Sequence, residues 1–362
     1  MKYVHGGDIY TAAKQWGSPD ILDYSSNLNP MGMPLPVQQA LHQAVEESWR
    51  YPDPRCTRLT QALAQWEQQR PEWIVCGNGA ADLIFRLVQA IRPQNALVPA
   101  PTFAEYEQAL QGVGCRVQRH FLSREKGFAP DETLLQRIHP GIELVFFCNP
   151  NNPTGYLTEK GYLTALLERC ATLDAWLVVD ECFLDFVPQG EKYSLKEALS
   201  RYPKLIILRA FTKIFAMAGV RLGYCISSNT QLLTALQEVG QPWSVSTFAQ
   251  KAGIAAVKVG MDSDYLAKTH QMVEQQRELL SQSLTNHSFT VFPSAANYLM
   301  FHTDRISLHQ QLLQRGILIR DCSNYPGLTK GDYRIAVRSK QENLRFLEIL
   351  NGIFGGADAP SA

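Results

Sequence analysis

The chain has 362 residues, with 34 Lys plus Arg and 34 Asp plus Glu, so its formal net charge at pH 7 is zero. A balanced chain offers no electrostatic reason to bind nucleic acid or an anionic membrane, because both partners need a clustered positive excess. The apolar fraction of 45% and the charged fraction of 19% are typical of a globular protein. A chain of this length commonly forms more than one domain.

The eight cysteines are scattered, and no two of them are spaced as C-x-x-C. Isolated cysteines in apolar runs are typical of core residues in a reducing compartment, whereas zinc sites and disulfide frameworks need closer clusters. Residues 1–10 lack the apolar segment of a signal peptide, and no run approaches 18 consecutive apolar residues. We therefore expect a cytoplasmic protein without a metal site or a membrane span.

The first 45 residues show little regular pattern up to Pro36 and are rich in Gly, Pro and Asn. We interpret residues 1–45 as an N-terminal arm that packs along another part of the protein and adds a segment to a smaller domain.

Residues 46–245 alternate short apolar runs with amphipathic helical patterns. The helix candidates are Arg58–Gln68, Asp82–Ala90 and Leu163–Ala171. The strand candidates are continuously apolar, as strands covered on both faces are: Trp73–Cys76, Ala96–Val98, Leu144–Cys148, Trp176–Val179, Leu205–Leu208 and Tyr224–Ile226. Such alternation predicts a large α/β domain with a mostly parallel sheet between helices.

The pattern changes after about residue 245, and residues 246–362 predict a smaller α+β domain. A long helical pattern, Tyr265–Leu284, comes first, and two shorter ones follow at Leu308–Gln314 and Glu342–Leu350. The strand candidates of this part are Phe289–Phe292, Tyr298–Phe301, Ile317–Arg320 and Tyr333–Val337.

The densest chemical signal runs from Arg209 to Gly223 and contains Lys213 and Arg221. Lys213 has apolar neighbours, which disfavour the charged form of an amine, and such an amine can add to a carbonyl as a Schiff-base nucleophile. The planar donor group of Arg221 can hold a phosphate. Taken alone, the segment favours a simpler interpretation, in which Lys213 reaches solvent and Arg221 forms a surface ion pair.

Asp180 follows the apolar run Trp176–Val179, at the strand end where α/β sheets place their ligands. A carboxylate in this position can pair with a pyridinium nitrogen and keep it protonated. A helix cap or a structural ion pair would use an aspartate in the same place, so both interpretations stay open.

A turn over Asn149–Gly155, with two prolines and a glycine, directly follows the predicted strand Leu144–Cys148. It could present the amide of Asn152 to a ring oxygen, although an ordinary turn has the same composition.

The segment Gly77–Asp82 places Gly79 and Ala80 between a predicted strand and a predicted helix. Glycines at such a junction allow backbone N–H groups to face an anion at the helix N-terminus. The segment lacks the G-x-G-x-x-G pattern, which argues against a dinucleotide site.

Together these four signals supply an amine for an aldehyde, a carboxylate for a ring nitrogen, an amide for a ring oxygen and a cradle for a phosphate. Pyridoxal 5'-phosphate has all four of these features. The combined pattern therefore predicts a pyridoxal-phosphate site more specifically than any one member does.

The motifs N-N-P-T-G, D-E-x-F and F-T-K-x-F-x-x-x-G-x-R-x-G, in this order, resemble those of the fold type I pyridoxal-phosphate enzymes, the aspartate aminotransferase superfamily. The resemblance covers the whole chain and implies a mostly parallel seven-stranded sheet in the large domain. It implies that Lys213 binds the cofactor aldehyde and that Asp180 pairs with the pyridinium. It further implies that Arg334 holds the substrate α-carboxylate and that the remaining cofactor contacts are Gly79, Ala80, Phe103, Asn152, Thr212 and Arg221.

The arm sequence His5-Gly-Gly-Asp8 and the stretches around Asn27, Tyr51 and Arg320 are similar to the L-threonine-O-3-phosphate decarboxylase family of cobalamin biosynthesis. This resemblance implies decarboxylation of L-threonine O-3-phosphate to (R)-1-amino-2-propanol O-2-phosphate. It places the substrate among His5, Gly6, Asn27, Asn152, Arg320 and Arg334. It also implies a homodimer in which Tyr51 reaches the cofactor phosphate of the neighbouring subunit.

Two positions depart from the wider superfamily pattern. Phe183 stands where aminotransferases usually carry a tyrosine, which favours the decarboxylase, and Ala210 stands where a serine usually contacts the cofactor phosphate. Two alternatives stay open: an aminotransferase of the histidinol-phosphate type, and a non-enzymatic regulator that binds pyridoxal phosphate. Glu105 and Tyr106, on a predicted helix after Phe103, are interpreted as structural.

Overall fold

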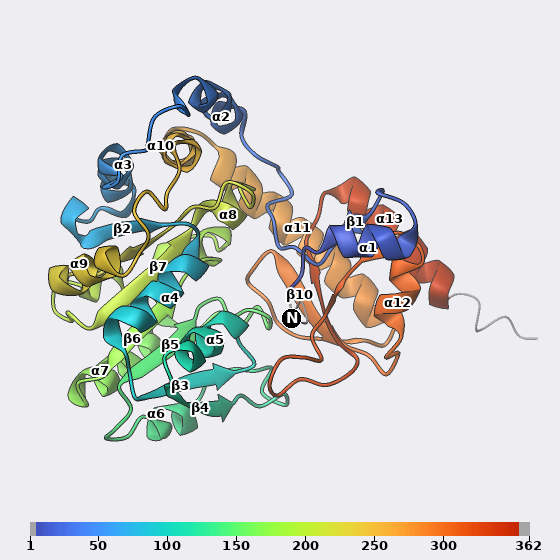
Figure 1. The fold of residues 1–362 in the computed structure, drawn as a ribbon. Coiled ribbons are helices and arrows are strands. Elements are labelled where there is room, and N and C mark those ends of the chain that lie inside the picture. The colour runs from blue at the N-terminus through green and yellow to red at the C-terminus, as the bar shows by residue number, and fades with distance from the viewer. Residues whose placement is uncertain (1–4, 355–362) are drawn as a thin grey trace, which may run out of the picture.

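A computed structural model of the chain describes residues 5–354, and its centre is a seven-stranded sheet in the order β2-β8-β7-β6-β5-β3-β4 (Figure 1). Only β8 runs antiparallel to its neighbours, so the sheet is mostly parallel. The strands are β2 (Ile74–Gly77), β3 (Asn95–Ala100), β4 (Arg116–Phe121), β5 (Leu144–Cys148), β6 (Trp176–Asp180), β7 (Leu205–Ala210) and β8 (Gly223–Ile226).

The central strands are apolar throughout because both faces of the sheet are covered. On β6, Leu177 and Val179 pack into the core on one face, and Val178 packs into the core on the other. The helices that contribute to the first core include α3 (Thr57–Glu67), α7 (Lys160–Thr172) and α10 (Thr247–Asp262). The helices that contribute to the second are α4 (Ala80–Ile91), α5 (Ala104–Gly112) and α9 (Thr230–Glu238).

A smaller antiparallel sheet, in the order β12-β13-β10-β9, lies beside the large one (Figure 1). Its strands are β9 (Thr290–Val291), β10 (Tyr298–His302), β12 (Arg320–Asp321) and β13 (Asp332–Ala336). The helices that accompany it are α11 (Tyr265–Asn286), α12 (Leu308–Leu313) and α13 (Lys340–Phe354).

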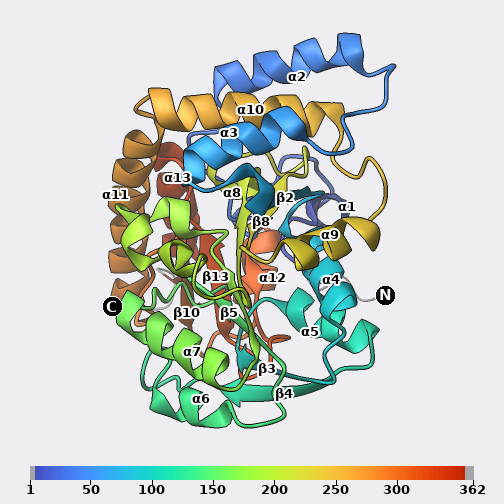
Figure 2. The ribbon, with the colours of Figure 1, turned by 90° about the vertical axis from the view of Figure 1, so that its left-hand side faces the viewer.

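The N-terminal arm joins this smaller region. Its strand β1 (Leu22–Asp23) pairs in parallel with β11 (Ile317–Leu318), and the buried Tyr24 packs in the same core as Phe346. The arm also contains α1 (Ile9–Trp16) and α2 (Leu35–Glu47). Figures 1 and 2 show α2 beside α10 and α3 at one end of the large sheet.

The α/β class and the mostly parallel sheet are confirmed, and all six strands predicted in residues 46–245 are present. Edge strand β4 was not predicted, because its side chains are mostly polar and all of them are exposed or half-buried, so they form no apolar run. The predicted strand Ile317–Arg320 is wrong as a single element, since it divides into β11 and β12 in two different sheets. The domain boundaries at residues 45 and 245 stay predictions.

Within residues 5–354, no helix is long and apolar enough to cross a membrane. The same part of the chain contains no cluster of three His, Cys, Asp or Glu side chains that could hold a metal ion.

Candidate active site

A cavity of about 440 Å³ lies where the carboxyl ends of β5, β6 and β7 meet the arm and the smaller sheet. It brings together eleven of the fourteen residues that the sequence predicts for the site. These are His5, Gly6, Asn27, Ala80, Phe103, Asn152, Asp180, Thr212, Lys213, Arg221 and Arg334.

Lys213 lies just after β7 on the short helix α8 (Phe211–Ile214), and the side chains of Phe211 and Ile214 beside it are fully buried. Burial lowers the pKa of the Lys213 amine, and the charges of Arg221 and Arg334 lower it further. An amine with a lowered pKa is more often neutral near pH 7 and is therefore a better nucleophile and proton carrier.

Asp180 ends β6, and both of its carboxylate oxygens accept hydrogen bonds. Oδ1 accepts from the backbone N–H of Cys182 at 3.0 Å, and Oδ2 accepts from the hydroxyl of Tyr106 at 2.6 Å. The Tyr106 ring stacks on Phe146 with centroids 4.7 Å apart. Burial and the Asp180 charge hold the pKa of Tyr106 well above its usual range, so the hydroxyl remains a donor.

Tyr106 is thus a site residue that the sequence interpretation missed. It follows Phe103 by three positions, close to one helical turn, so α5 places Tyr106 next to Asp180 and Phe103 at the cavity wall. The spacing of Phe103 and Tyr106 was the only signal in the sequence. It could not indicate the hydrogen bond to Asp180, because that contact depends on how α5 packs against β6.

Arg334, on β13, connects the smaller sheet to both the arm and the large sheet. Its Nη1 donates to Oδ1 of Asn152, and its Nη2 donates to the backbone oxygen of Ser25 at 2.8 Å. The third nitrogen, Nε, is buried and has no hydrogen-bond partner among residues 5–354. A buried guanidinium that lines a cavity and has an N–H group without a partner in the described residues suits a carboxylate ligand.

The N-terminus of α4 forms a cradle with Arg221. Gly79 caps this helix with a φ of 83°, and a Cβ at this position would lie 2.7 Å from Nη2 of Arg221. Glycine is therefore required for the guanidinium to approach the helix end. A cation beside unpaired N–H groups suits a phosphate, so the residues present fit the phosphate end of pyridoxal phosphate. Gly79 itself lies behind the cavity wall that Ala80 and Arg221 form.

The second group of polar side chains predicted for an anion lies on the arm side of the cavity. Asn27 is buried, and its Oδ1 has no hydrogen-bond partner in the described part of the chain. Arg320 lies beside the cavity rather than in its wall, where its Nη2 donates to Asn324 at 2.8 Å. Its guanidinium is 5.2 Å from the ring of Tyr325, which does line the cavity.

Tyr51 lies outside the cavity of its own chain. Its side chain is 79% exposed and stacks on Trp243 with centroids 4.5 Å apart. Its expected role in a neighbouring subunit stays a prediction. Phe183 and Ala210, the two departures from the superfamily pattern, both line the cavity.

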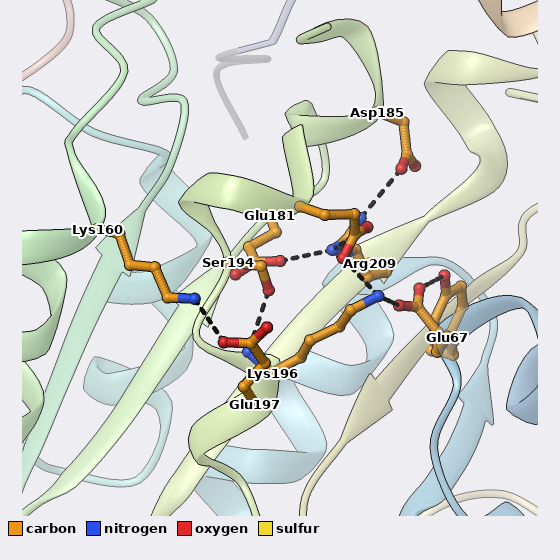
Figure 3. Close-up of polar contacts among 10 residues, drawn as sticks. Glu67, Lys160, Glu181, Asp185, Ser194, Lys196, Glu197 and Arg209 are labelled. Carbon is orange, nitrogen blue, oxygen red and sulfur yellow. Dashed lines mark hydrogen bonds and ion pairs between the residues drawn. The ribbon is translucent and has the colours of Figure 1, made fainter. Parts of the chain in front are cut away.

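A buried group of charges lies directly behind the site and involves Arg209 of β7 (Figure 3). The Arg209 side chain is 1% exposed and contacts Glu181 at 2.8 Å and Asp185 at 3.0 Å. Glu67 of α3 accepts from the hydroxyl of Tyr224 at 2.5 Å and lies 3.4 Å from Lys196. Burial raises the pKa of Glu181 to about 7 and that of Asp185 to about 6.

Comparisons with known proteins show which family the chain is similar to. Residues 19–350 match the family model "Aminotransferase class I and II". The chain is 38% identical over 358 residues to threonine-phosphate decarboxylase of Salmonella typhimurium, covering 98% of this chain and 97% of that protein. It is 30% identical to the adenosylcobalamin biosynthesis bifunctional protein of Leptospira interrogans, covering 97% of this chain and 41% of that protein.

Among solved structures, histidinol-phosphate aminotransferase from Sinorhizobium meliloti, in complex with pyridoxal-5'-phosphate, has a similar fold. The TM-score is 0.87 at 22% identity, and the alignment covers 99% of this chain and 96% of that one.

The first prediction concerns Tyr106. Tyr106→Phe removes a buried hydrogen bond to a carboxylate, so we expect the free energy of unfolding to fall by about 1.5–3 kcal/mol. The control is Tyr162→Phe, which removes a hydroxyl that donates to the neutral backbone oxygen of Asp131. Urea unfolding of both variants is the measurement. An equal, small loss in the two variants would contradict a charge-assisted bond to Asp180.

The second prediction concerns Arg209. Arg209→Met leaves Glu181 and Asp185 buried without their cation, so we expect a loss of about 3–5 kcal/mol. Without the cation the folded-state pKa values of these carboxyls rise further above their unfolded values. The protonated carboxyls then favour the folded state at low pH, and this contribution is lost as pH rises. The loss should therefore be larger near pH 8 than near pH 5.

Urea unfolding at the two pH values measures this difference. Arg119→Met, which removes a surface partner of Glu107, is the control and should cost less than about 1 kcal/mol. A loss of stability in Arg209→Met that does not depend on pH would contradict the idea that Glu181 and Asp185 become buried, uncompensated charges.

Proposed function

Because the chain belongs to the class I and II aminotransferase family, we propose that it uses pyridoxal phosphate to decarboxylate L-threonine O-3-phosphate. The products would be carbon dioxide and (R)-1-amino-2-propanol O-2-phosphate, for use in cobalamin biosynthesis. The observation that carries the proposal is that His5 and Asn27 of the arm line the same cavity as Lys213 and Asp180.

The cofactor would lie between Phe103 and the ends of the central strands. Arg221 and the N-terminus of α4 would hold its phosphate, Asp180 its ring nitrogen and Asn152 its ring oxygen. When bound, pyridoxal phosphate supplies an aldehyde for amino groups and a ring that accepts the electron pair of a broken bond. The support for this assignment is the close approach of Arg221 to Gly79 and the fixed carboxylate of Asp180.

The substrate has two anionic ends, and we assign each end to its own group of side chains. Arg334, which lines the cavity, would bind the carboxylate. His5, Asn27 and Arg320 would bind the phosphate on the arm side. Holding both ends fixes the direction of the bond between Cα and the carboxylate, so binding energy at the remote phosphate sets the geometry of the bond that breaks.

Lys213 is the residue that we assign to proton transfer. Its lowered pKa lets it lose and regain a proton near neutral pH, and it lies in the same cavity as the groups that hold the substrate. After carbon dioxide leaves, Lys213 would deliver the proton to Cα.

A homodimer is part of the proposal. Tyr51 and Trp243 form an exposed aromatic pair that lies outside the cavity of their own chain. Exposed aromatic side chains are common at interfaces between proteins. We propose that this pair faces a second copy, where Tyr51 reaches the neighbouring cofactor phosphate.

A second candidate is amino transfer to or from a histidinol-phosphate-like substrate. It is favoured by the similarity in fold to the Sinorhizobium meliloti enzyme. Amino transfer would convert the cofactor to pyridoxamine phosphate, whereas decarboxylation returns it unchanged.

The third prediction tests the proposed reaction. The protein loaded with pyridoxal phosphate should release carbon dioxide from L-threonine O-3-phosphate. Lys213→Ala should reduce kcat by at least about 100-fold, because it removes the residue that carries the proton. Carbon dioxide release and pyridoxamine phosphate formation are measured side by side.

Lys204→Ala is the control, because Lys204 makes a surface ion pair with Asp174 and should leave the rate unchanged. Formation of pyridoxamine phosphate from histidinol phosphate, without carbon dioxide from threonine phosphate, would replace the decarboxylase by the aminotransferase.

A further inference from the structure

Glu105 is a largely buried residue whose carboxylate lines the cavity, and the proposed reaction gives this residue no role. It lies in the first turn of α5, and its Oε1 is 3.2 Å from Nε2 of His5. Only 13% of its side chain is exposed, and its Oε2 has no hydrogen-bond partner in residues 5–354. A buried polar atom of this kind is rarely retained for stability alone.

The arm brings His5 to Glu105 along a fixed path. A Cβ at Gly6 would lie 2.2 Å from the backbone oxygen of Ser25, and the N–H of Gly7 donates to Oγ of Ser25 at 2.7 Å. The Ser25 hydroxyl in turn donates to Asp23 at 2.6 Å. The backbone that follows His5 is thus held against Ser25 of the arm, and Glu105 contacts the imidazole from α5.

The pair lies among other charges. Burial lowers the pKa of His5, and the cations Arg320 and Arg334 lower it further. Burial raises the pKa of Glu105 to about 7, an effect that Lys213 and Arg320 oppose and that Asp180 increases. A bound anion would offset the two arginine charges that face His5, and the carboxylate of Glu105 would then support a protonated imidazole.

We propose that Glu105 is a positioning residue for the phosphate end of the substrate, because it holds the His5 imidazole at the cavity and stabilises its protonated form. The inference rests on the proposed function, since it assumes a substrate that carries a phosphate. Glu105 alone would repel that phosphate, so its favourable effect depends on the proton that His5 carries.

The fourth prediction is a difference in KM that depends on pH. In Glu105→Gln the protonated His5 loses its charged partner, so the pKa of His5 in the complex falls. We expect KM for L-threonine O-3-phosphate to rise about tenfold at about pH 8, where Glu105 is ionised in the wild type and supports the protonated imidazole. At about pH 6, below the pKa of about 7 to which burial raises Glu105, this side chain carries less charge in the wild type, and the difference should shrink to less than about threefold. kcat should change less than about threefold at either pH, since binding rather than chemistry is affected.

A double-mutant cycle separates this role from simple packing. In a His5→Asn background, Glu105→Gln should raise KM less than about twofold, because the residue through which Glu105 acts is already absent. Glu105→Asp, which keeps the charge, should give a KM between those of the wild type and Glu105→Gln.

Two matched controls complete the experiment. Glu107→Gln changes a carboxylate in the same helical turn that pairs with Arg119 on the surface, and it should leave KM unchanged. L-threonine lacks the phosphate, so its inhibition constant should be the same for the wild type and Glu105→Gln.

The contrary outcomes are distinct. A rise in KM that is equal in the wild-type and His5→Asn backgrounds, or equal at both pH values, would assign Glu105 to packing. A lower KM in Glu105→Gln would mean that the carboxylate opposes phosphate binding, and either result overturns the inference. If the wild type releases no carbon dioxide from threonine phosphate, the proposed function fails and this inference fails with it. If the wild type does release carbon dioxide and either contrary result is found, the proposed function stands and only the role of Glu105 is rejected.

Discussion

The site depends on the ion pairs that Arg209 makes inside the large sheet. Arg209 of β7 contacts Glu181, which directly follows Asp180. This contact joins the end of β6, which carries Asp180, to the end of β7, after which α8 carries Lys213. A charge with 1% exposure needs such partners, since an unpaired buried charge costs several kcal/mol. The pairing thus fixes the relative position of the carboxylate and the amine, and Figure 3 shows that it reaches outward to Glu67 and Lys196.

The smaller sheet and the arm supply the remaining walls of the cavity at the strand ends of the large sheet. Arg334 contacts Asn152 of the large region and Ser25 of the arm, so one side chain joins three segments that are far apart in the sequence. The pairing of β1 with β11 holds the arm in place for these contacts. The proposed carboxylate site would therefore form only when all three segments are folded together, which would couple folding of the arm to assembly of the cavity.

The sequence predicted the strands of the large sheet because continuous apolar runs such as Leu144–Cys148 are a direct record of burial on both faces. It could not predict β4, whose exposed polar side chains carry no such record. The structure brings eleven of the residues named from the motifs and the resemblance to one cavity. The sequence did not single out Tyr106, because its hydrogen bond to Asp180 is a contact that sequence spacing does not encode.

The balance of charge in the cavity explains why the arm matters for the choice of reaction. In the proposed reaction Lys213, Arg221 and Arg334 would serve the cofactor and the α-carboxylate, and these roles do not distinguish decarboxylation from amino transfer. The arm adds His5 and Asn27, with Arg320 nearby, and Glu105 on α5 contacts His5. Selectivity in the proposed reaction would therefore arise from where the substrate's second anion is held, because that position determines which bond at Cα is presented for cleavage.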